Sequence, residues 1–438
     1  MDEKDLRALA GELLRKLDIQ RRELKIYRDY YRGDFPLPYV PNAALTEYLP
    51  LLLRSRSNWC RKVVDITARR LVVIGVRSNA SDAEALWDVW QRSRMDARQQ
   101  IVHRSATRYG ITYVTVGRGS TAADGTVTGG DVTIRAHSPL NVAHLEDPAD
   151  PDLVTAAVRS WSSTGGQRFS YLWTPDEWVL FRLDAAARKS VIDRGEHGLG
   201  QVPVVPFKNL VEEDGTYTSD LQIALPIQDR INQTIADRLM TQTYGAHRQR
   251  VMIGLELEDD EDGQPKIPFR PSVDRTWFVE DAGVKIEEFA ETALAPFIAA
   301  AEADIKHLAS LTDTPPQDLL GEMVNISAEA LKAAQSANSA KVADRALAFG
   351  EKHEQVLNLV AVTAGLEPDP QMEIVWKDTE PYSESQRMDA LSKKRDLGVP
   401  LQTIWAEMGY SPAQITQLMG QVESEARLAA SSVGPTGA

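Results

Sequence analysis

The spacing of apolar residues predicts a long amphipathic helix at the start of the chain. Four leucines recur at intervals of three and four residues, which places them on one helix face. They are Leu6, Leu9, Leu13 and Leu17. We expect this helix to span residues 3–32 and to end at Gly33, since glycine commonly ends helices. The same spacing predicts helices over residues 58–71 and 82–108.

A strand pattern begins after Gly110. Residues 111–116 alternate between apolar and polar side chains, as is typical of a strand with one buried face. Further strands, separated by Gly, Pro, Asp and Ser clusters, are predicted over residues 132–135, 154–161, 168–173, 178–183 and 202–207. The Asp- and Pro-rich residues 141–152 predict a surface loop. The first half of the chain is therefore predicted to be one α+β domain.

The second half is mainly helical. A long helix is predicted from residue 225 through Arg250, with one narrow apolar seam made by Ile227, Ile231, Ile235 and Leu239. Polar flanks beside a thin seam indicate a helix that packs mostly on other helices, although an ordinary surface helix gives the same pattern. Short acidic strands and turns are predicted over 251–288, followed by a helix over 293–311 and the longest helix over 327–364. A strand is predicted over 372–376, then two or three helices between 383 and 430 and a disordered tail over 431–438.

Composition narrows the class of protein. With 438 residues, 43% of them hydrophobic, the chain exceeds the size of a single core, so two or more regions are expected. The one cysteine, Cys60, allows no internal disulfide and is predicted to be a core residue. The acidic start argues against a secretory leader, and no apolar run approaches the roughly 20 residues that cross a membrane. A net charge of −14 argues against a tight grip on nucleic acid.

Motifs for catalysis and for cofactor binding are missing from the sequence. There is no phosphate-binding loop, dinucleotide fingerprint, zinc-protease helix or nucleophile elbow, and the seven histidines are scattered. The acidic run 259–262 before Gly263 resembles a calcium loop, but Phe269 stands where the bidentate glutamate belongs. We therefore predict no catalytic residues, no metal site and no cofactor.

Several motifs, in this order, resemble the portal proteins of tailed bacteriophages with long non-contractile tails. The resemblance extends over about residues 5–425. The motifs are Tyr30-Tyr31-Arg32-Gly33, Asn58-Trp59-Cys60-Arg61-Lys62-Val63-Val64-Asp65, Tyr109-Gly110-Ile111-Thr112-Tyr113-Val114, Gly200-Gln201-Val202-Pro203-Val204-Val205-Pro206-Phe207 and Ile326-Ser327-Ala328-Glu329-Ala330-Leu331.

The resemblance implies a portal fold and a ring, usually of twelve subunits, at one capsid vertex of the virion, assembled in the host cytoplasm. Double-stranded DNA would pass through the ring without sequence specificity. The implied partners are the large terminase, head-completion or adaptor proteins, and the major capsid and scaffolding proteins, with no membrane. The implied regions are an α/β wing (1–223), two stem helices (224–250 and 289–313), a β-containing clip (251–288), a tunnel loop (314–326), a long wing helix with a strand (327–380), helical crown (381–430) and tail (431–438).

The same resemblance implies three groups of contact residues. The tunnel loop would face DNA with Gln317, Asp318, Glu322, Met323 and Asn325. The stem would lend positive charge to the tunnel with Arg230, Arg238, His247, Arg248 and Arg250, unless these residues are solvated or form ion pairs between subunits. The clip would dock partners with Asp259, Asp260, Glu261, Asp262 and Trp277.

Two rival classes remain at this stage. One is another virion structural protein, such as a capsid subunit or a head–tail adaptor. Two long helices that bracket a small acidic strand module are not needed by a capsid subunit. The other is a nuclease or protease whose site is assembled only by tertiary folding.

Overall fold

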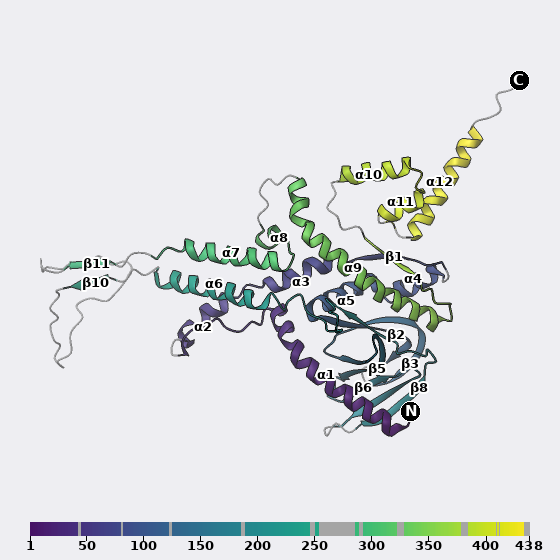
Figure 1. The fold of residues 1–438 in the computed structure, drawn as a ribbon, viewed down its shortest axis with the longest axis horizontal. Coiled ribbons are helices and arrows are strands. Elements are labelled where there is room, and N and C mark those ends of the chain that lie inside the picture. The colour runs from purple at the N-terminus through teal and green to yellow at the C-terminus, as the bar shows by residue number, and fades with distance from the viewer. Residues whose placement is uncertain are drawn as a thin grey trace. The chain divides into compact units, whose positions relative to one another are not determined.

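The computed structural model describes residues 1–42, 45–79, 82–121, 125–184, 189–245, 250–253, 285–288, 292–321, 328–377, 384–408, 410 and 412–432. The chain forms two compact units (Figure 1). The first comprises Met1–Asp34, Asn58–Leu225 and Ala309–Ala438, and the second comprises Phe35–Ser57 and Pro226–Leu308.

In the first unit, helix α1 (Glu3–Arg32) covers one face of a five-stranded antiparallel sheet. Asp2 caps its start, and Gly33 ends it with a φ of 90°, so the predicted boundaries are confirmed. Its leucines pack against Val158, Leu172 and Phe181 of the sheet. The strands, in sheet order, are β4 (Val142–Asp147), β5 (Asp150–Ser162), β6 (Arg168–Trp173), β7 (Glu177–Leu183) and β8 (Lys189–Glu196).

The prediction of a surface loop over residues 141–152 is wrong. Most of these residues form β4 and the start of β5, which pair from Val142↔Arg159 to Asp147↔Asp150. The Asp and Pro residues of this segment lie in the tight turn between the two strands and at their exposed ends. Val142 and Ala143, at the start of β4, are buried. The sequence does not predict strand β8, because its charged residues hide the alternation of a strand with one exposed face.

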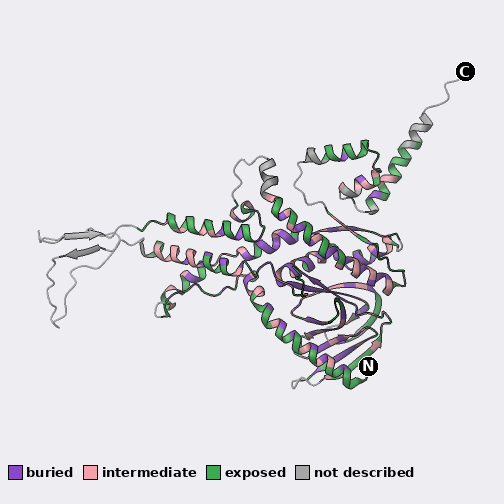
Figure 2. Cartoon of the chain, viewed as in Figure 1, coloured by how far each residue is buried: buried purple, intermediate pink, exposed green. Residues whose placement is uncertain are grey.

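A second sheet has the order β3 (Val127–His137), β2 (Ile111–Thr121) and β9 (Val204–Lys208). One face packs against α5 (Met95–Tyr109) and α9 (Ala328–Ala364) through the largest apolar core, which includes Val114, Ile134 and Phe349. Figure 2 shows that buried residues concentrate in the sheets of this unit. Gly110, with a φ of 83°, joins α5 directly to β2, in agreement with the prediction from the sequence.

Two predicted helices have different boundaries in the structure. The helix expected over 82–108 is two helices, α4 (Ala83–Arg92) and α5, because Arg94 adopts a left-handed φ of 56° between them. The helix expected over 58–71 is α3 (Trp59–Arg70), and Cys60 within it is buried as predicted. A strand that the sequence does not predict, β1 (Val73–Arg77), then pairs with β12 (Glu373–Trp376).

The C-terminal elements of the first unit largely follow the predictions. The longest helix is α9, and α8 (Pro316–Leu320) is a short helix within the segment expected to be a loop. Helices α10 (Glu384–Asp396), α11 (Leu401–Met408) and α12 (Pro412–Ser432) come last. The disordered tail predicted over 431–438 begins too early, because α12 extends through Ser432, and residues 433–438 lie outside the described residues.

The second unit contains α2 (Leu45–Arg54) and strands β10 (Arg250–Ile253) and β11 (Lys285–Glu288). It also contains all of α6 (Leu225–Gly245) except its first residue and all of α7 (Ala295–Leu311) except its last three residues. Figure 1 shows α6 and α7 side by side. The expected continuation of the helix through Arg250 is wrong, because α6 ends at Gly245 and Arg250 begins β10. The sequence does not predict helix α2, since Pro50 lies inside it.

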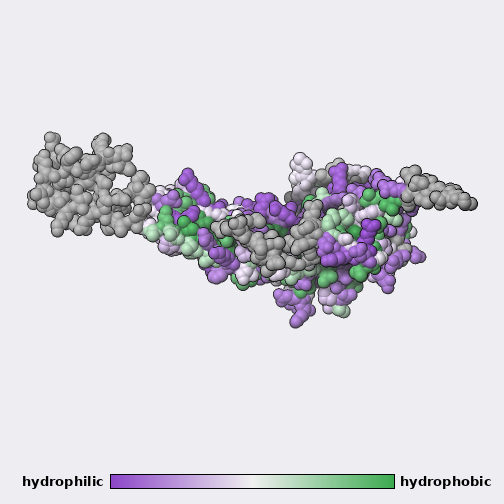
Figure 3. Space-filling view, turned by 90° about the horizontal axis from the view of Figure 1, so that it is seen from above, coloured by the Kyte–Doolittle hydropathy of each residue, from purple (hydrophilic) through white to green (hydrophobic). Residues whose placement is uncertain are grey.

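The surface of the protein carries both polar and apolar side chains. Apolar side chains are interspersed among polar ones on the face shown in Figure 3. Within the described part of the chain, no helix combines the length and the apolar character needed to cross a membrane.

Candidate functional site: a basic hollow on helix α3

Helix α3 carries two pairs of adjacent basic residues, Arg61-Lys62 and Arg69-Arg70, eight positions apart. Seven residues make almost two helical turns, so Lys62 and Arg69 lie on nearly the same side of the helix, with Arg61 and Arg70 flanking them. The helix starts at a fixed point because the side chain of Asn58 accepts a hydrogen bond of 2.9 Å from the backbone N–H of Arg61.

Asp65 lies between the two pairs and organises the arginines around it. Its carboxylate is buried and lies 2.9 Å from Arg104 Nε, 3.5 Å from Arg61 Nε and 3.7 Å from Arg69 Nη2. The Tyr31 hydroxyl donates a 2.8 Å hydrogen bond to the same carboxylate. Burial, and then the negative charge of Asp65, raises the pKa of Tyr31. One carboxylate therefore faces three guanidinium groups, which leaves a surplus of positive charge.

The other two cations on the helix hold neighbouring elements. Lys62 Nζ donates hydrogen bonds to the backbone oxygens of Asp318 (3.0 Å) and Leu319 (3.1 Å), and so fixes α8 against α3. Arg70 donates hydrogen bonds to the side chains of Asn338 and Ser339 on α9. Burial lowers the pKa of Arg70, although the charge of Asp318 opposes this effect.

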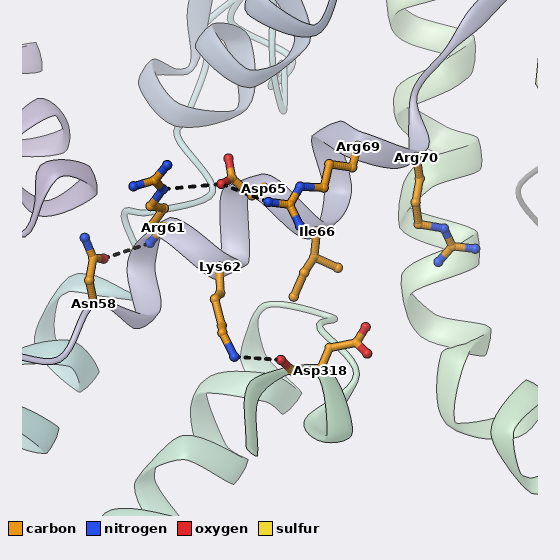
Figure 4. Close-up of a pocket in the computed structure, with 8 residues that line it drawn as sticks. All are labelled: Asn58, Arg61, Lys62, Asp65, Ile66, Arg69, Arg70 and Asp318. Carbon is orange, nitrogen blue, oxygen red and sulfur yellow. Dashed lines mark hydrogen bonds and ion pairs between the residues drawn. The ribbon is translucent and has the colours of Figure 1, made fainter. Parts of the chain in front are cut away.

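These groups line an open hollow of about 590 Å³ (Figure 4). Four of the lining residues are cationic and two are acidic, and the acidic Asp65 is already shared among arginines. Arg61 and Arg69 remain 64% and 70% exposed, so their guanidinium groups reach solvent. The lining residues are Asn58, Arg61, Lys62, Asp65, Ile66, Arg69, Arg70 and Asp318.

Anion binding is the chemistry that this arrangement supports. Guanidinium groups bind phosphate or carboxylate through paired hydrogen bonds, and two of them are exposed here. Across the described ranges, no three His, Cys, Asp or Glu side chains lie close enough together to hold a metal ion.

The structure places only some of the residues singled out from the sequence. Asp318 lies in the hollow and Gln317 lies beside it on α8. Arg230 forms a 2.7 Å ion pair with Asp304 of α7, and Arg238 lies on α6. Arg250 starts β10. The remaining predicted residues lie outside the described part of the chain: His247, Arg248, Asp259, Asp260, Glu261, Asp262, Trp277, Glu322, Met323 and Asn325.

None of the basic residues of α3 is among the contact residues predicted from the sequence, although Arg61 and Lys62 belong to one of the portal motifs. The spacing of Arg61-Lys62 and Arg69-Arg70 is a usable signal, since Lys62 and Arg69, seven residues apart, must lie on nearly the same side of a helix. The pairing of that side with α8 could not be predicted, because 256 positions separate Lys62 from Asp318.

Fold and site together define a mixed helix-and-sheet protein with a basic hollow on its surface. The family model described as phage portal protein, SPP1 Gp6-like, matches residues 12–412. The chain therefore belongs to this family of phage portal proteins, which confirms the resemblance found in the sequence.

Individual relatives are similar over most of their length. The portal protein of Mycobacterium phage D29 is 28% identical over 441 residues, covering 97% of this chain and 90% of the relative. The portal protein of Mycobacterium phage L5 is 28% identical over 393 residues, covering 85% and 80%.

Two solved structures also match, at 14% identity. The virion of a native gene transfer agent particle matches with a TM-score of 0.41, covering 87% of this chain and 95% of the other. The neck of such a particle, computed with C12 symmetry, matches with a TM-score of 0.44, covering 86% and 92%.

Proposed function

We propose that this chain forms a ring, usually of twelve subunits, at one vertex of the capsid of a tailed phage. The ring would be the conduit for double-stranded DNA during packaging and ejection. Membership of the portal family, through the match over residues 12–412, is the observation that carries the proposal.

Each region of the portal architecture has a counterpart among the described elements. The two sheets with α1, α3 to α5 and α9 would form the wing, α6 and α7 the stem, and β10 with β11 the base of the clip. Residues 314–326, which include α8, would be the tunnel loop, and α10 to α12 the crown.

Exposed apolar residues on α7 support ring formation. Ile305 and Leu308 are buried within one chain, but Ile298 is 43% exposed, and Ala299 and Ala300 beside it are also exposed. An exposed group of apolar residues of this kind gains stability when a neighbouring subunit covers it. A head-to-tail contact would close into a ring if the rotation between neighbouring subunits divides a full turn evenly.

The basic hollow on α3 would be a contact for DNA phosphates. Its cations lie beside α8, at the start of the segment expected to face the DNA. Contacts to phosphate are independent of sequence, as a conduit requires. The overall acidic charge of the chain would keep each contact weak enough for the DNA to slide.

Replacing one exposed arginine of the hollow should weaken DNA binding in a salt-dependent way. For R69Q we expect the slope of log affinity against log salt concentration to fall by about 0.9 for each phosphate that the arginine would neutralise. Filter binding of a short duplex to the assembled protein, over a series of salt concentrations, measures this slope.

The exposed residue Arg22 of α1 supplies the matched control, since R22Q makes the same change in charge outside the hollow. Equal slopes for wild type, R69Q and R22Q would show that Arg69 does not bind DNA.

The proposed role is structural, and the protein would have no catalytic activity of its own. The large terminase, the head-completion or adaptor proteins, and the capsid and scaffolding proteins would dock on the ring in the host cytoplasm and the virion. Incubation of the purified protein with DNA or casein and divalent metals should give no turnover. Measurable turnover would favour the rival enzyme class instead.

Genetic complementation tests the function directly. A phage that lacks this gene should make heads that remain empty of DNA, and supply of the chain from a plasmid should restore filled heads. Filling of heads without the chain would overturn the proposal.

A further inference from the structure

A second cationic cluster lies between the two sheets of the first unit, separate from the hollow on α3. The sheets pack together at one end through Tyr113 and Val204 of one sheet and Ala157 and Trp173 of the other. Further along, β3 contributes Arg135 and β5 contributes Arg159 in place of apolar residues.

The strand register puts these side chains on the facing surfaces of the sheets. Residues 132 and 134 of β3 belong to the core with α5 and α9, so Arg135 points to the opposite side, toward the five-stranded sheet. Val158 packs under α1, so the adjacent Arg159 points away from α1 and toward β3. Tyr171 is the direct cross-strand partner of Arg159 and shares its face.

Among the residues that the structure describes, neither guanidinium lies within ion-pairing distance of a carboxylate. Arg135 donates a hydrogen bond to the backbone oxygen of Gly119, and the Arg159 guanidinium lies 4.9 Å from the centre of the Trp161 ring. The nearby Asp193, whose charge raises the pKa of Tyr171 after the larger effect of burial, is exposed and accepts a hydrogen bond from the backbone N–H of Arg194. The positive charge of the cluster is therefore not neutralised by these neighbours.

The electrostatics show that the cations repel one another. Burial, and then the charges of Arg159 and Arg135, lower the pKa of His137 on β3 to about 3. Burial and then the charge of Arg135 lower the pKa of Arg159, and burial and then the charge of Arg98 on α5 lower that of Arg135. Two like charges held together in a half-buried place raise the free energy of the empty site, and a bound anion would remove that cost.

Aromatic rings form the wall next to the cations. Trp161 stacks on Phe169 with ring centres 5.6 Å apart, and Tyr171 stacks on Trp178 at 5.2 Å. Both arginines and Tyr171 are partly exposed, so solvent reaches the cluster. The Tyr171 hydroxyl has no hydrogen-bond partner in the described ranges and is available as a third donor.

We propose that Arg135, Arg159 and Tyr171 form a binding site for a phosphate group between the two sheets. Two planar guanidinium groups and one phenol supply donors on several sides of a tetrahedral oxyanion. The donors come from strands on the facing sides of the two packed sheets. This inference does not depend on the proposed role as a conduit.

Thermal unfolding of the full chain with increasing inorganic phosphate tests the site. Phosphate stabilises most proteins through exclusion from their surface, so the comparison among variants carries the test. The wild type should show a saturating rise in its unfolding midpoint. R159Q and R135Q should lose about tenfold or more in phosphate affinity, whereas R22Q, on the far side of the five-stranded sheet, should match the wild type.

One further variant and one further ligand make this experiment more specific. R159K keeps the charge but not the planar fork, so it should retain saturation at weaker affinity. A deoxynucleoside monophosphate distinguishes a nucleotide phosphate from free phosphate, because only the nucleotide gains from stacking on the aromatic wall. Equal phosphate responses in wild type, R159Q and R135Q would overturn the proposal, as would a response that never saturates.

Discussion

At the scale of single residues, the buried pair His103 and His353 shows how a fold holds two histidines neutral. His103 Nδ1 donates to the backbone oxygen of Leu71 (3.0 Å), so its Nε2 must accept the 2.9 Å hydrogen bond from His353 Nε2. His353 Nδ1 is then a buried acceptor without a donor in the described part of the chain. Both rings lie among aromatic side chains such as Phe349 and Trp376. The packing therefore excludes the protonated state.

This pair predicts a loss of stability in mild acid. Burial lowers the pKa of His103 to about 4 and that of His353 well below its usual value, whereas the unfolded chain takes up these protons near pH 6.5. The folded state keeps its full stability above about pH 6.5. It loses stability as the pH falls toward the pKa that the two histidines have in the folded chain. For each such histidine, the free energy of unfolding should fall by about 2 kcal/mol between pH 7 and pH 5.

Unfolding measured across this pH range checks the effect. H353Q should show a shallower dependence on pH than the wild type. H307Q, which replaces an exposed histidine of α7, should keep the wild-type dependence. Identical pH profiles for H353Q and the wild type would contradict the assignment.

At the scale of elements, α9 ties together parts of the first unit that are distant in sequence. Lys341 lies 2.5 Å from the buried carboxylate of Asp220, just before α6, and Arg345 lies 3.7 Å from it. Lys341 also donates to the backbone oxygen of Thr312, just after α7, and Asn338 donates to that of Asp313. One helix thus fixes the chain segment just before α6 and the segment just after α7.

Removing the central carboxylate should be strongly destabilising. D220A leaves Lys341 and Arg345 buried without their counter-ion, which should cost about 3 kcal/mol or more in the free energy of unfolding. Urea unfolding of the full chain measures the change. D18A, which removes the carboxylate of an exposed ion pair with Arg21, should behave as the wild type. Equal losses of stability for D220A and D18A would contradict the buried role of Asp220.

The sequence predicts elements best where one periodicity dominates. The leucine spacing of α1 and the helix-forming composition of α9 set both helices almost to the residue. Prediction fails where local composition competes with tertiary packing. A left-handed Arg94 divides the helix expected over 82–108, and pairing with β5 turns an Asp- and Pro-rich segment into β4.

The candidate sites are harder to predict than the elements. Both cationic clusters combine residues from several elements, as Lys62 with Asp318 and Arg135 with Arg159 illustrate. Short sequence patterns contain no information about such contacts. Asp318 is singled out only through the resemblance to portal proteins, and the structure adds the basic partners around it.

At the scale of the whole molecule, we expect the chain to be one subunit of a closed ring. The portal family match covers nearly all of its length, and the exposed apolar residues Ile298, Ala299 and Ala300 of α7 provide a surface that a neighbour would cover. A ring would also explain why the chain carries a net charge of −14 and places its basic groups locally, since DNA must pass without being held.

Electron microscopy of the purified full chain is the decisive measurement for ring formation. We predict closed rings, usually of twelve subunits, with an axial hole and with the segment 314–326 facing that hole. Discrete monomers at high protein concentration, or rings in which this segment lies far from the axis, would contradict the proposed architecture.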